Sequence, residues 1–224
     1  MFVSTRKLLL LNLLELPKNL LRSQSLSINS RKIVLDTETT GLNHYKDKIV
    51  SICAQEIINN KPGVSWHSYI NPKKKSSRQA QTCHKIQPNY LNNRPTFEEI
   101  SNSFLSFIRN STLIIHNAQF DIHFINSELY RINIKPLSND VICTLKLSRK
   151  LYSYKKNTLD NLCDRYGIDR SFRDKNGHGA FIDVELLSQA YLKIIDIYGD
   201  NSTKKGLYFA PNEKWMPKIK KSIF

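Results

Sequence analysis

Apolar residues in the first third of the chain occur in short runs of strand type. The runs cover residues 33–35, 49–57 and 65–70. Asparagine, proline and glycine at 59–63 supply a turn between the second run and the third. The first three strands are therefore predicted to form a meander with hairpin connections.

From Pro95 onward the apolar residues recur at helical spacing. Thr96 and Glu99 match a capping box ahead of an apolar stripe that ends at Ile108. Further along, the pattern predicts strands at 112–115 and 141–144 and helices at about 120–131, 158–166 and 179–198. The side chains expected to be buried in the last helix are Phe181, Leu186, Leu187, Ala190, Leu192 and Ile195. Hairpin strands followed by strands alternating with helices predict an α/β fold, with a mixed five-stranded sheet flanked by helices.

The two ends of the chain differ in composition from its middle, which predicts three segments. Residues 1–30 form a basic, leucine-rich extension, residues 31–199 hold the predicted strands and helices, and residues 200–224 form a basic tail. The extension resembles an organellar transit peptide in composition, but an ordinary extension on a cytoplasmic bacterial protein is the favoured interpretation. No apolar run approaches the roughly 20 residues that span a bilayer, so no membrane contact is expected.

The charge of the chain favours a polyanionic partner. Lysine and arginine number 34 against 19 aspartates and glutamates, which gives a formal net charge of +15. Phosphates are attracted by such a field, and the counterions released from them drive binding. The alternative is a composition set by an AT-rich genome, because asparagine, isoleucine and serine are also frequent. Charge alone therefore favours nucleic acid without locating a site.

The first candidate site is the sequence DTETTG at 36–41, where the first predicted strand ends. Side chains alternate in an extended chain, so Asp36 and Glu38 are predicted to point to the same side. Two such carboxylates repel each other unless a cation lies between them. Hard oxygen ligands of this kind suit Mg²⁺ or Mn²⁺. Taken alone, the same residues also fit a polar exit from a strand into a turn.

Two later motifs each combine a histidine with an acid. HNAQFD at 116–121 ends on Asp121, which on its own fits a helix cap. HGAFID at 178–183 places His178 and Asp183 about one and a half helical turns apart, so both face one cleft only if the histidine lies in a loose, glycine-flanked entry to the helix. Together the three motifs supply four acids and one histidine, the set that a two-metal phosphodiesterase site requires. The histidine can accept the proton of the attacking water.

In this order, DTETTG, HNAQFD and HGAFID resemble the three exonuclease motifs of the DEDDh family, which has an RNase H-like exonuclease fold. The similarity covers roughly residues 31–199 and is greatest to the epsilon-type proofreading exonucleases of bacterial DNA polymerase III. It implies 3′→5′ hydrolysis of the terminal phosphodiester with release of 5′-mononucleotides. The resemblance assigns Asp36, Glu38, Asp121 and Asp183 as ligands of two divalent cations, Mg²⁺ or Mn²⁺, and His178 as the general base.

The resemblance also implies contacts with the substrate. The residues that it assigns are Asp36, Glu38, Gln79, His84, His116, Asn117 and Asp183. His84 lies in CHKI at 83–86, which resembles the family's His-Gly-Ile element, and Gln79 stands where a glutamate is usual. Ser51, Cys53 and Cys143 are further departures that remove no ligand but affect the expected substrate contacts and activity level. The residues expected along the DNA backbone are Lys73, Lys74, Lys75 and Arg78.

The partners implied by the resemblance are a single-stranded or frayed DNA 3′ end and the polymerase catalytic subunit. A sliding clamp and a small accessory subunit are further expected members of the assembly. Residues 204–209 resemble a clamp-binding peptide without its leading glutamine, and residues 215–224 are a candidate polymerase contact. Two alternatives stay open: an RNA-trimming exonuclease of the same family, and an inactive domain that bridges polymerase and clamp.

Overall fold

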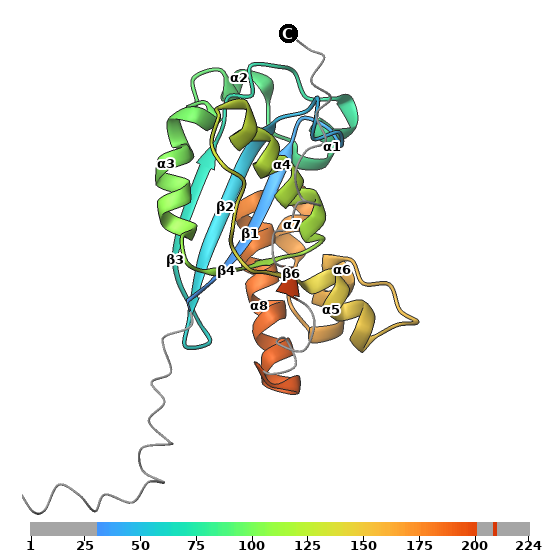
Figure 1. The fold of residues 1–224 in the computed structure, drawn as a ribbon. Helices are drawn as coiled ribbons and strands as arrows, with labels where there is room; N and C mark the ends of the chain where they lie inside the picture. The colour runs from blue at the N-terminus through green and yellow to red at the C-terminus, as the bar shows by residue number, and fades with distance from the viewer. Residues whose placement is uncertain (1–30, 201–207, 210–224) are drawn as a thin grey trace, which may run out of the picture. The chain divides into compact units, whose positions relative to one another are not determined.

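A computed structural model describes residues 31–200 and 208–209, which form a mixed sheet with helices on both faces (Figure 1). The strand order is β3 (Lys61–Tyr69), β2 (Ile49–Ile58), β1 (Lys32–Thr39), β4 (Thr112–Ile115), β5 (Val141–Cys143) and β6 (Tyr208–Phe209). β2 is antiparallel to both β1 and β3, whereas β4 is parallel to β1 and β5 is parallel to β4. The predicted five strands are confirmed, and the two-residue β6 pairs antiparallel with β5 as a sixth.

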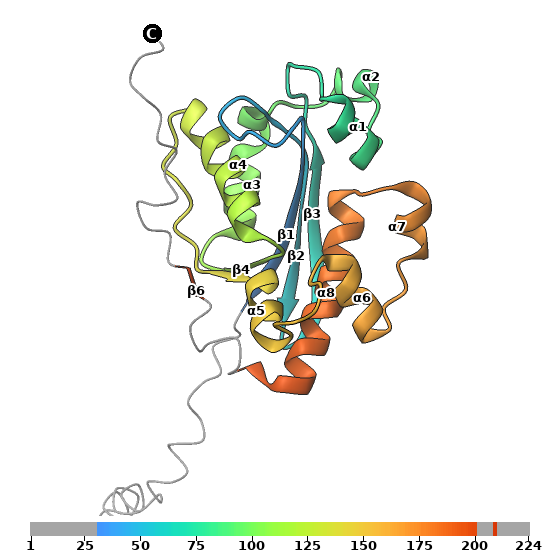
Figure 2. The ribbon, with the colours of Figure 1, turned by 90° about the vertical axis from the view of Figure 1, so that its right-hand side faces the viewer.

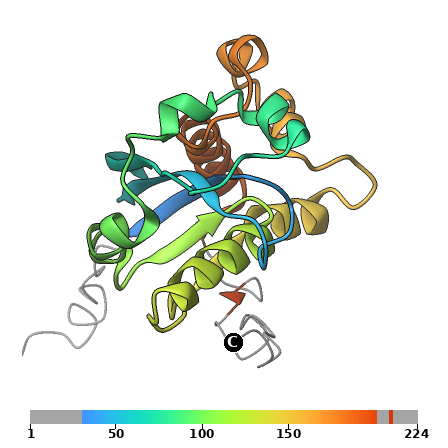
Figure 3. The same cartoon turned by 90° about the horizontal axis from the view of Figure 1, so that it is seen from above.

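The alternation of side chains along β1 divides its residues between two cores. Ile33 and Leu35 pack on the face covered by α3 (Phe97–Ile108) and α4 (Ala118–Arg131). Val34 packs on the opposite face, under α6 (Leu159–Tyr166) and α8 (Ala180–Tyr198). Figure 3 shows the sheet between these two helical layers. Because the alternation continues, Asp36 and Glu38 belong to the α8 face of the strand and Thr37 to the α4 face.

Two of the predicted helix boundaries follow their sequence signals closely. The Thr96 side chain accepts a hydrogen bond from the Glu99 backbone, and the Glu99 carboxylate accepts one from the Thr96 backbone at 2.6 Å, which completes the capping box of α3. At α6 the Thr158 hydroxyl accepts from the Asn161 backbone, and Gly167 ends that helix in the left-handed conformation with φ 64°. Each of these caps is typically worth about 1 kcal/mol.

Four helices were not predicted: α1 (Arg78–His84), α2 (Pro88–Leu91), α5 (Thr144–Leu151) and α7 (Ser171–Asn176). None is longer than eight residues. A period of 3.6 is recognisable only over a window of about 11 residues or more, so such helices leave no clear pattern. For α1 a local signal exists, because the Ser77 hydroxyl caps the helix by accepting from the Ala80 backbone.

Three further expectations need correction. β1 continues past Asp36 to Thr39, so Asp36 lies inside the strand rather than at its end. The turn between β2 and β3 is confined to Asn59 and Asn60, both with positive φ, and β3 already begins at Lys61. Phe181, in the first turn of α8, is 44% exposed rather than buried, and its ring lies beside that of His67 on β3.

The structure bears on membrane contact only through its helices. Within the described part of the chain, none of them is both long and apolar enough to cross a bilayer. The extension at 1–30 and the candidate polymerase contact at 215–224 lie outside the described residues, as does the candidate clamp-binding peptide apart from Tyr208 and Phe209.

Candidate active site

Three of the four predicted acids converge on the α8 face of the sheet. Asp36 and Glu38 come from β1, and Asp183 comes from the first turn of α8, which packs across β1 and β2. One carboxylate oxygen of each residue lies within 4.8 Å of the other two. The predicted common orientation of Asp36 and Glu38 is thus present, and α8 supplies the third oxygen.

Asp121, the fourth acid, approaches from the other side of β1. It lies in the first turn of α4 and is 2% exposed. Its Oδ1 accepts hydrogen bonds from the Thr37 backbone nitrogen at 3.0 Å and from the Thr37 hydroxyl at 2.8 Å. Thr37, between the two acids of β1, therefore ties the second motif to the first. Its role is not visible in the sequence, because a threonine in a strand is ordinary.

Burial and mutual repulsion make the charged forms of these carboxylates unfavourable. Burial raises the pKa of Asp36 well above its usual range, and repulsion from the neighbouring acids adds to this effect. Burial, followed by repulsion from Asp183 and Asp121, raises the pKa of Glu38 to about 8. Burial also raises the pKa of Asp121 to about 7, against the opposing hydrogen bonds from Thr37. At neutral pH such a cluster either holds protons or needs a compensating cation.

The donor set fits a hard divalent cation. All of its candidate ligands are carboxylate oxygens, without the sulfur or multiple imidazole ligands that favour softer metals. A cation bound between them would remove the repulsion that raises the pKa values of Asp36 and Glu38. The residues present are therefore compatible with the divalent ions that the sequence motifs imply.

His178 lies beside the acids, in the loop between α7 and α8. Its Nδ1 is 3.4 Å from Oδ2 of Asp183, and 43% of its side chain is exposed. Its backbone nitrogen donates to the carbonyl of Cys83 at 3.1 Å, which attaches the loop to the end of α1; Figure 2 shows α1 and α7 on the same side of β1. Gly177 has φ +88°, and a Cβ there would lie 2.8 Å from the Lys85 side chain. The glycine-flanked entry to the helix is therefore confirmed.

An arginine outside the three motifs completes this group. Arg173 of α7 is 5% exposed and forms a buried ion pair with Asp183 at 2.5 Å. It also donates to His178 Nδ1 at 2.8 Å and pairs with Asp160 of α6. The chain has 34 lysines and arginines, and only the folded structure shows that Arg173 lies beside Asp183 and Asp160.

The acids open into a cavity of about 810 Å³. Asp36, Asp183 and His178 line it together with His116 and Asn117, two of the predicted substrate contacts. Nδ1 of His116 forms a hydrogen bond of 3.0 Å with the Thr144 hydroxyl. Burial lowers the pKa of His116 to about 4, so its ring is neutral near pH 7. Basic residues of α5 and the loop after it line the same cavity: Arg149, Lys155 and Lys156.

The other predicted substrate residues lie elsewhere around the site. Gln79 and Arg78 line a neighbouring cavity of about 700 Å³ that also includes Arg173 and His178. His84 is buried, and its Nδ1 accepts from the Ile86 backbone, so its Nε2 carries a proton that meets no partner among the described residues. Lys73 and Lys74 line a different hollow, next to α3 and α4. The expected backbone path along residues 73–75 therefore stays a prediction.

Sequence comparison assigns the family. The family model described as Exonuclease matches residues 33–191, which is most of the chain. A DNA polymerase III subunit epsilon of Buchnera aphidicola subsp. Schizaphis graminum is 42% identical over 206 residues, covering 86% of this chain and 85% of the relative. The chain belongs to this exonuclease family of epsilon subunits. The corresponding protein of Buchnera aphidicola subsp. Baizongia pistaciae is 49% identical over 171 residues, 72% of this chain and 69% of that one.

The fold of this exonuclease agrees with a solved structure of the DEDDh type. The nuclease domain of 3′hExo, described as a DEDDh family member bound to rAMP, superposes with a TM-score of 0.66. The alignment covers 78% of this chain and 96% of the other, at 13% identity. At that identity the likeness shows the fold, which is the RNase H-like exonuclease fold predicted from the motifs.

The departures of this exonuclease from the expected pattern lie outside the acid cluster. Ser51 of β2 is buried, and its hydroxyl is 3.0 Å from Nε2 of His67 on β3. Cys53 is buried in the core under α8, and Cys143 ends β5 in the core on the other face. None of the three is among the residues whose oxygens converge, so the departures alter the surroundings of the site and leave the ligands in place.

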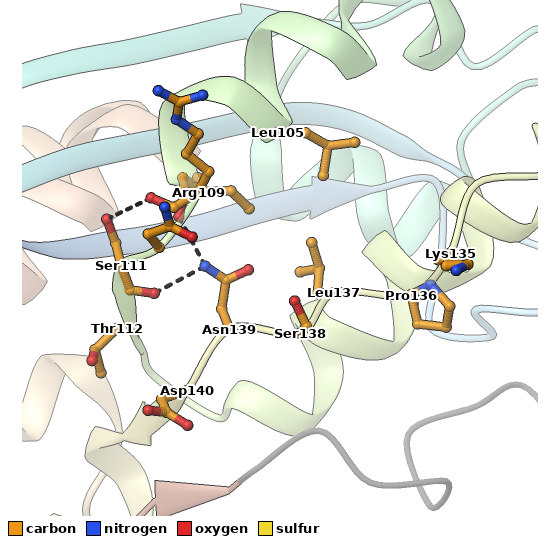
Figure 4. A pocket seen from close by; sticks show the side chains of 12 residues that line it. Leu105, Arg109, Ser111, Thr112, Lys135, Pro136, Leu137, Ser138, Asn139 and Asp140 are labelled. Carbon is orange, nitrogen blue, oxygen red and sulfur yellow. Dashed lines mark hydrogen bonds between the residues drawn. The ribbon is translucent and has the colours of Figure 1, made fainter.

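A cavity of about 380 Å³ lies apart from these residues, between the end of α3 and the loop at 135–140 (Figure 4). Asn139 donates to the carbonyls of Ile108 and Ser111 at 2.8 and 2.9 Å and so ties the loop to the end of the helix. No candidate site residue lines this cavity. The hydrogen bonds of Asn139 at this cavity serve to hold the loop at 135–140 against the end of α3.

Proposed function

We propose that this chain is a 3′→5′ exonuclease that removes the terminal nucleotide of DNA and proofreads for a replicative DNA polymerase III. The observation that carries the proposal is the convergence of Asp36, Glu38 and Asp183 within 4.8 Å, with His178 at 3.4 Å from Asp183. The relatives described above are named as epsilon subunits of that polymerase.

The proposed ligands are the four acids of the motifs: Asp36, Glu38, Asp121 and Asp183. They would hold two divalent cations, Mg²⁺ or Mn²⁺, which when bound would activate a water and stabilise the leaving oxygen. Thr37 keeps Asp121 turned toward β1. The exposed edge of His178 allows it to reach the water and accept its proton, a role typically worth about 10²–10⁴ in rate.

The proposed substrate is a single-stranded or frayed 3′ end. A mispaired terminus costs less to unstack, so it enters a narrow site more readily than a paired one. Three basic side chains line the cavity that contains Asp36 and Asp183, and they favour binding of the DNA phosphate backbone there: Arg149, Lys155 and Lys156. His116 and Asn117 line the same cavity and could meet the terminal nucleotide. In this proposal the polymerase catalytic subunit is the partner and the cytoplasm is the location, while clamp and accessory-subunit contacts remain predictions.

The proposal is tested by digestion of 5′-labelled oligonucleotides by the full chain, with a matched 3′ end, a mismatched 3′ end, or the RNA equivalent. We expect stepwise loss from the 3′ end in Mg²⁺ or Mn²⁺, faster on the mismatched DNA and absent in EDTA. Asp36→Ala should lower the rate by at least about 10² while the fold persists, because it removes one ligand and also relieves repulsion. Asp196→Ala, an exposed acid of α8, is the matched control.

Each alternative predicts a different result in this assay. A clear preference for RNA would replace the DNA substrate and leave the mechanism unchanged. Complete absence of nucleotide release with both metals would support an inactive bridging domain. Near-normal digestion by Asp36→Ala would contradict the assignment of the acids themselves.

A further inference from the structure

Arg173 holds the atoms that the proposed chemistry needs. Its Nε donates to Oδ1 of Asp183 at 2.5 Å, and its Nη2 donates to Oδ2 at 3.1 Å. The same Nη2 donates to Nδ1 of His178 at 2.8 Å. One buried guanidinium therefore engages both oxygens of a candidate metal ligand and one ring nitrogen of the candidate base.

The contact with Asp183 opposes the binding of a divalent cation. A two-pronged arginine–carboxylate pair uses a lone pair on each oxygen and places a fixed positive charge against them. Arg173 is close enough to the other acids to lower the pKa of both Asp36 and Glu38. Since guanidinium stays charged in proteins, this positive charge cannot be removed by deprotonation. A cation entering the cluster must therefore displace Arg173 or tolerate its repulsion.

The contact with His178 determines which ring nitrogen carries the proton. Guanidinium nitrogens only donate, so Nδ1 of His178 must be the acceptor in this hydrogen bond. A neutral ring that accepts at Nδ1 carries its proton on Nε2. The ring of His178 is therefore held at Nδ1 by the same guanidinium that holds Asp183.

Arg173 has a second anionic partner that could retain it. Asp160 on α6 pairs with its Nη1, and the Asp160 side chain is 39% exposed, unlike that of Asp183 at 7%. Because the guanidinium is held from both α6 and α8, loss of Asp183 leaves it with Asp160. Arg173 can thus move away from the acids without becoming an unpaired buried charge.

We propose that Arg173 is a positioning residue that competes with a divalent cation for Asp183. The same guanidinium also donates to Nδ1 of His178, so its displacement from Asp183 would release that ring nitrogen as well. The proposal rests on the metal site of the proposed function. It differs from a purely structural brace between α7 and α8, because a brace would aid metal binding by orienting Asp183.

The first test is the affinity of the full chain for Mn²⁺ at pH 8, measured by titration calorimetry. We expect Arg173→Gln to bind Mn²⁺ at least about tenfold more tightly than the wild type, because a nearby like charge is removed. Arg173→Lys, which keeps the charge but loses the two-pronged contact, should lie between them. Arg170→Gln is the matched control, since that neighbouring arginine forms ion pairs with the exposed acids Asp164 and Asp174.

The outcomes separate this inference from the proposed function. Wild-type protein that binds no Mn²⁺ would overturn the metal site and this inference with it. Wild-type binding with equal or weaker binding by Arg173→Gln would overturn the competition alone and favour the brace.

The second test needs no variant. The Nε–H signal of Arg173 and the ring nitrogens of His178 are followed by ¹⁵N NMR while Mg²⁺ is added. We expect the Arg173 signal to shift as Mg²⁺ binds Asp183, and the Nδ1 signal of His178 to shift as it loses its hydrogen bond from Arg173. An Arg173 signal that stays unchanged at Mg²⁺ concentrations that saturate the site would contradict the proposal.

Discussion

Replacing Glu38 by glutamine should stabilise the metal-free protein at alkaline pH. Glu38 lies within 4.8 Å of Asp36 and Asp183, oxygen to oxygen. Burial and the charges of Asp183 and Asp121 raise its pKa from 4.5 to about 8. Glutamine has the same shape and no charge, so it removes the repulsion without leaving a void.

The size of the effect follows from the pKa. In the unfolded chain Glu38 loses its proton near pH 4.5, whereas in the fold it keeps the proton until about pH 8. Between these values the folded state binds more protons, so stability falls as pH rises through this window and stays low above it. A difference of this size corresponds to at most about 5 kcal/mol, at 1.36 kcal/mol per pH unit. The new amide needs hydrogen-bond partners at a cost of about 1–3 kcal/mol, which leaves a net gain of at most roughly 2–4 kcal/mol.

The measurement is thermal unfolding followed by circular dichroism in EDTA, at pH 5 and at pH 8.5. At pH 8.5 we expect the Glu38→Gln midpoint to exceed that of the wild type by roughly 5–10 °C. At pH 5 the variant should have no advantage and should be equally or less stable, because the cost of the amide remains while the repulsion is almost absent. Added Mn²⁺ should reverse the order, because an amide is a weaker ligand than a carboxylate. Glu98→Gln, an exposed acid at the start of α3, is the control. A variant no more stable than the wild type at pH 8.5 in EDTA would refute the argument.

Three further substitutions test other parts of the site and fold. Gly177→Ala should lower activity and cost about 1–3 kcal/mol in denaturant unfolding, since φ is +88° and the new Cβ would lie 3.0 Å from the carbonyl of Cys83; unchanged stability would contradict this. Thr37→Val removes a hydrogen bond that lowers the pKa of Asp121, so the acidic limb of the pH–rate profile should move to higher pH; a limb that stays in place would mean that another group sets it. Thr96→Ala should cost about 1 kcal/mol through loss of the α3 cap, with digestion rates unchanged.

The sequence predicts those parts of the site that depend on local pattern. Period two along β1 is enough to place Asp36 and Glu38 on one side, because alternation holds in any extended chain. The glycines around His178 indicate a loop before α8 rather than a continuous helix, which is what the structure has. Strong caps such as Thr96 and Thr158 likewise mark the starts of their helices.

Contacts between distant segments are the part that a single sequence does not reveal. Arg173 meets Asp183 and Asp160 only because α7 folds against α6 and α8, and nothing in its neighbours distinguishes it from other arginines. Composition does not distinguish the lysine-rich loop at 73–75 from the lysine-rich loop after α5. Only the fold shows that Lys155 and Lys156 of the second loop line the cavity that contains Asp36 and Asp183. α5 itself is too short for its period to be recognised.

The sheet order explains why three unremarkable motifs become one site. β4 lies parallel to β1 and ends level with Leu35, so the chain leaving β4 enters α4 beside the last residues of β1. This brings Asp121 to Thr37 on one face of the strand. On the other face α8 crosses β1 with its N-terminus at the same end, which brings Asp183 to Asp36. The first two motifs are therefore joined by strand pairing, whereas the third is joined only by packing of one helix. Weakened packing of α8 should accordingly separate Asp183 from the cluster before Asp121 is lost from Thr37.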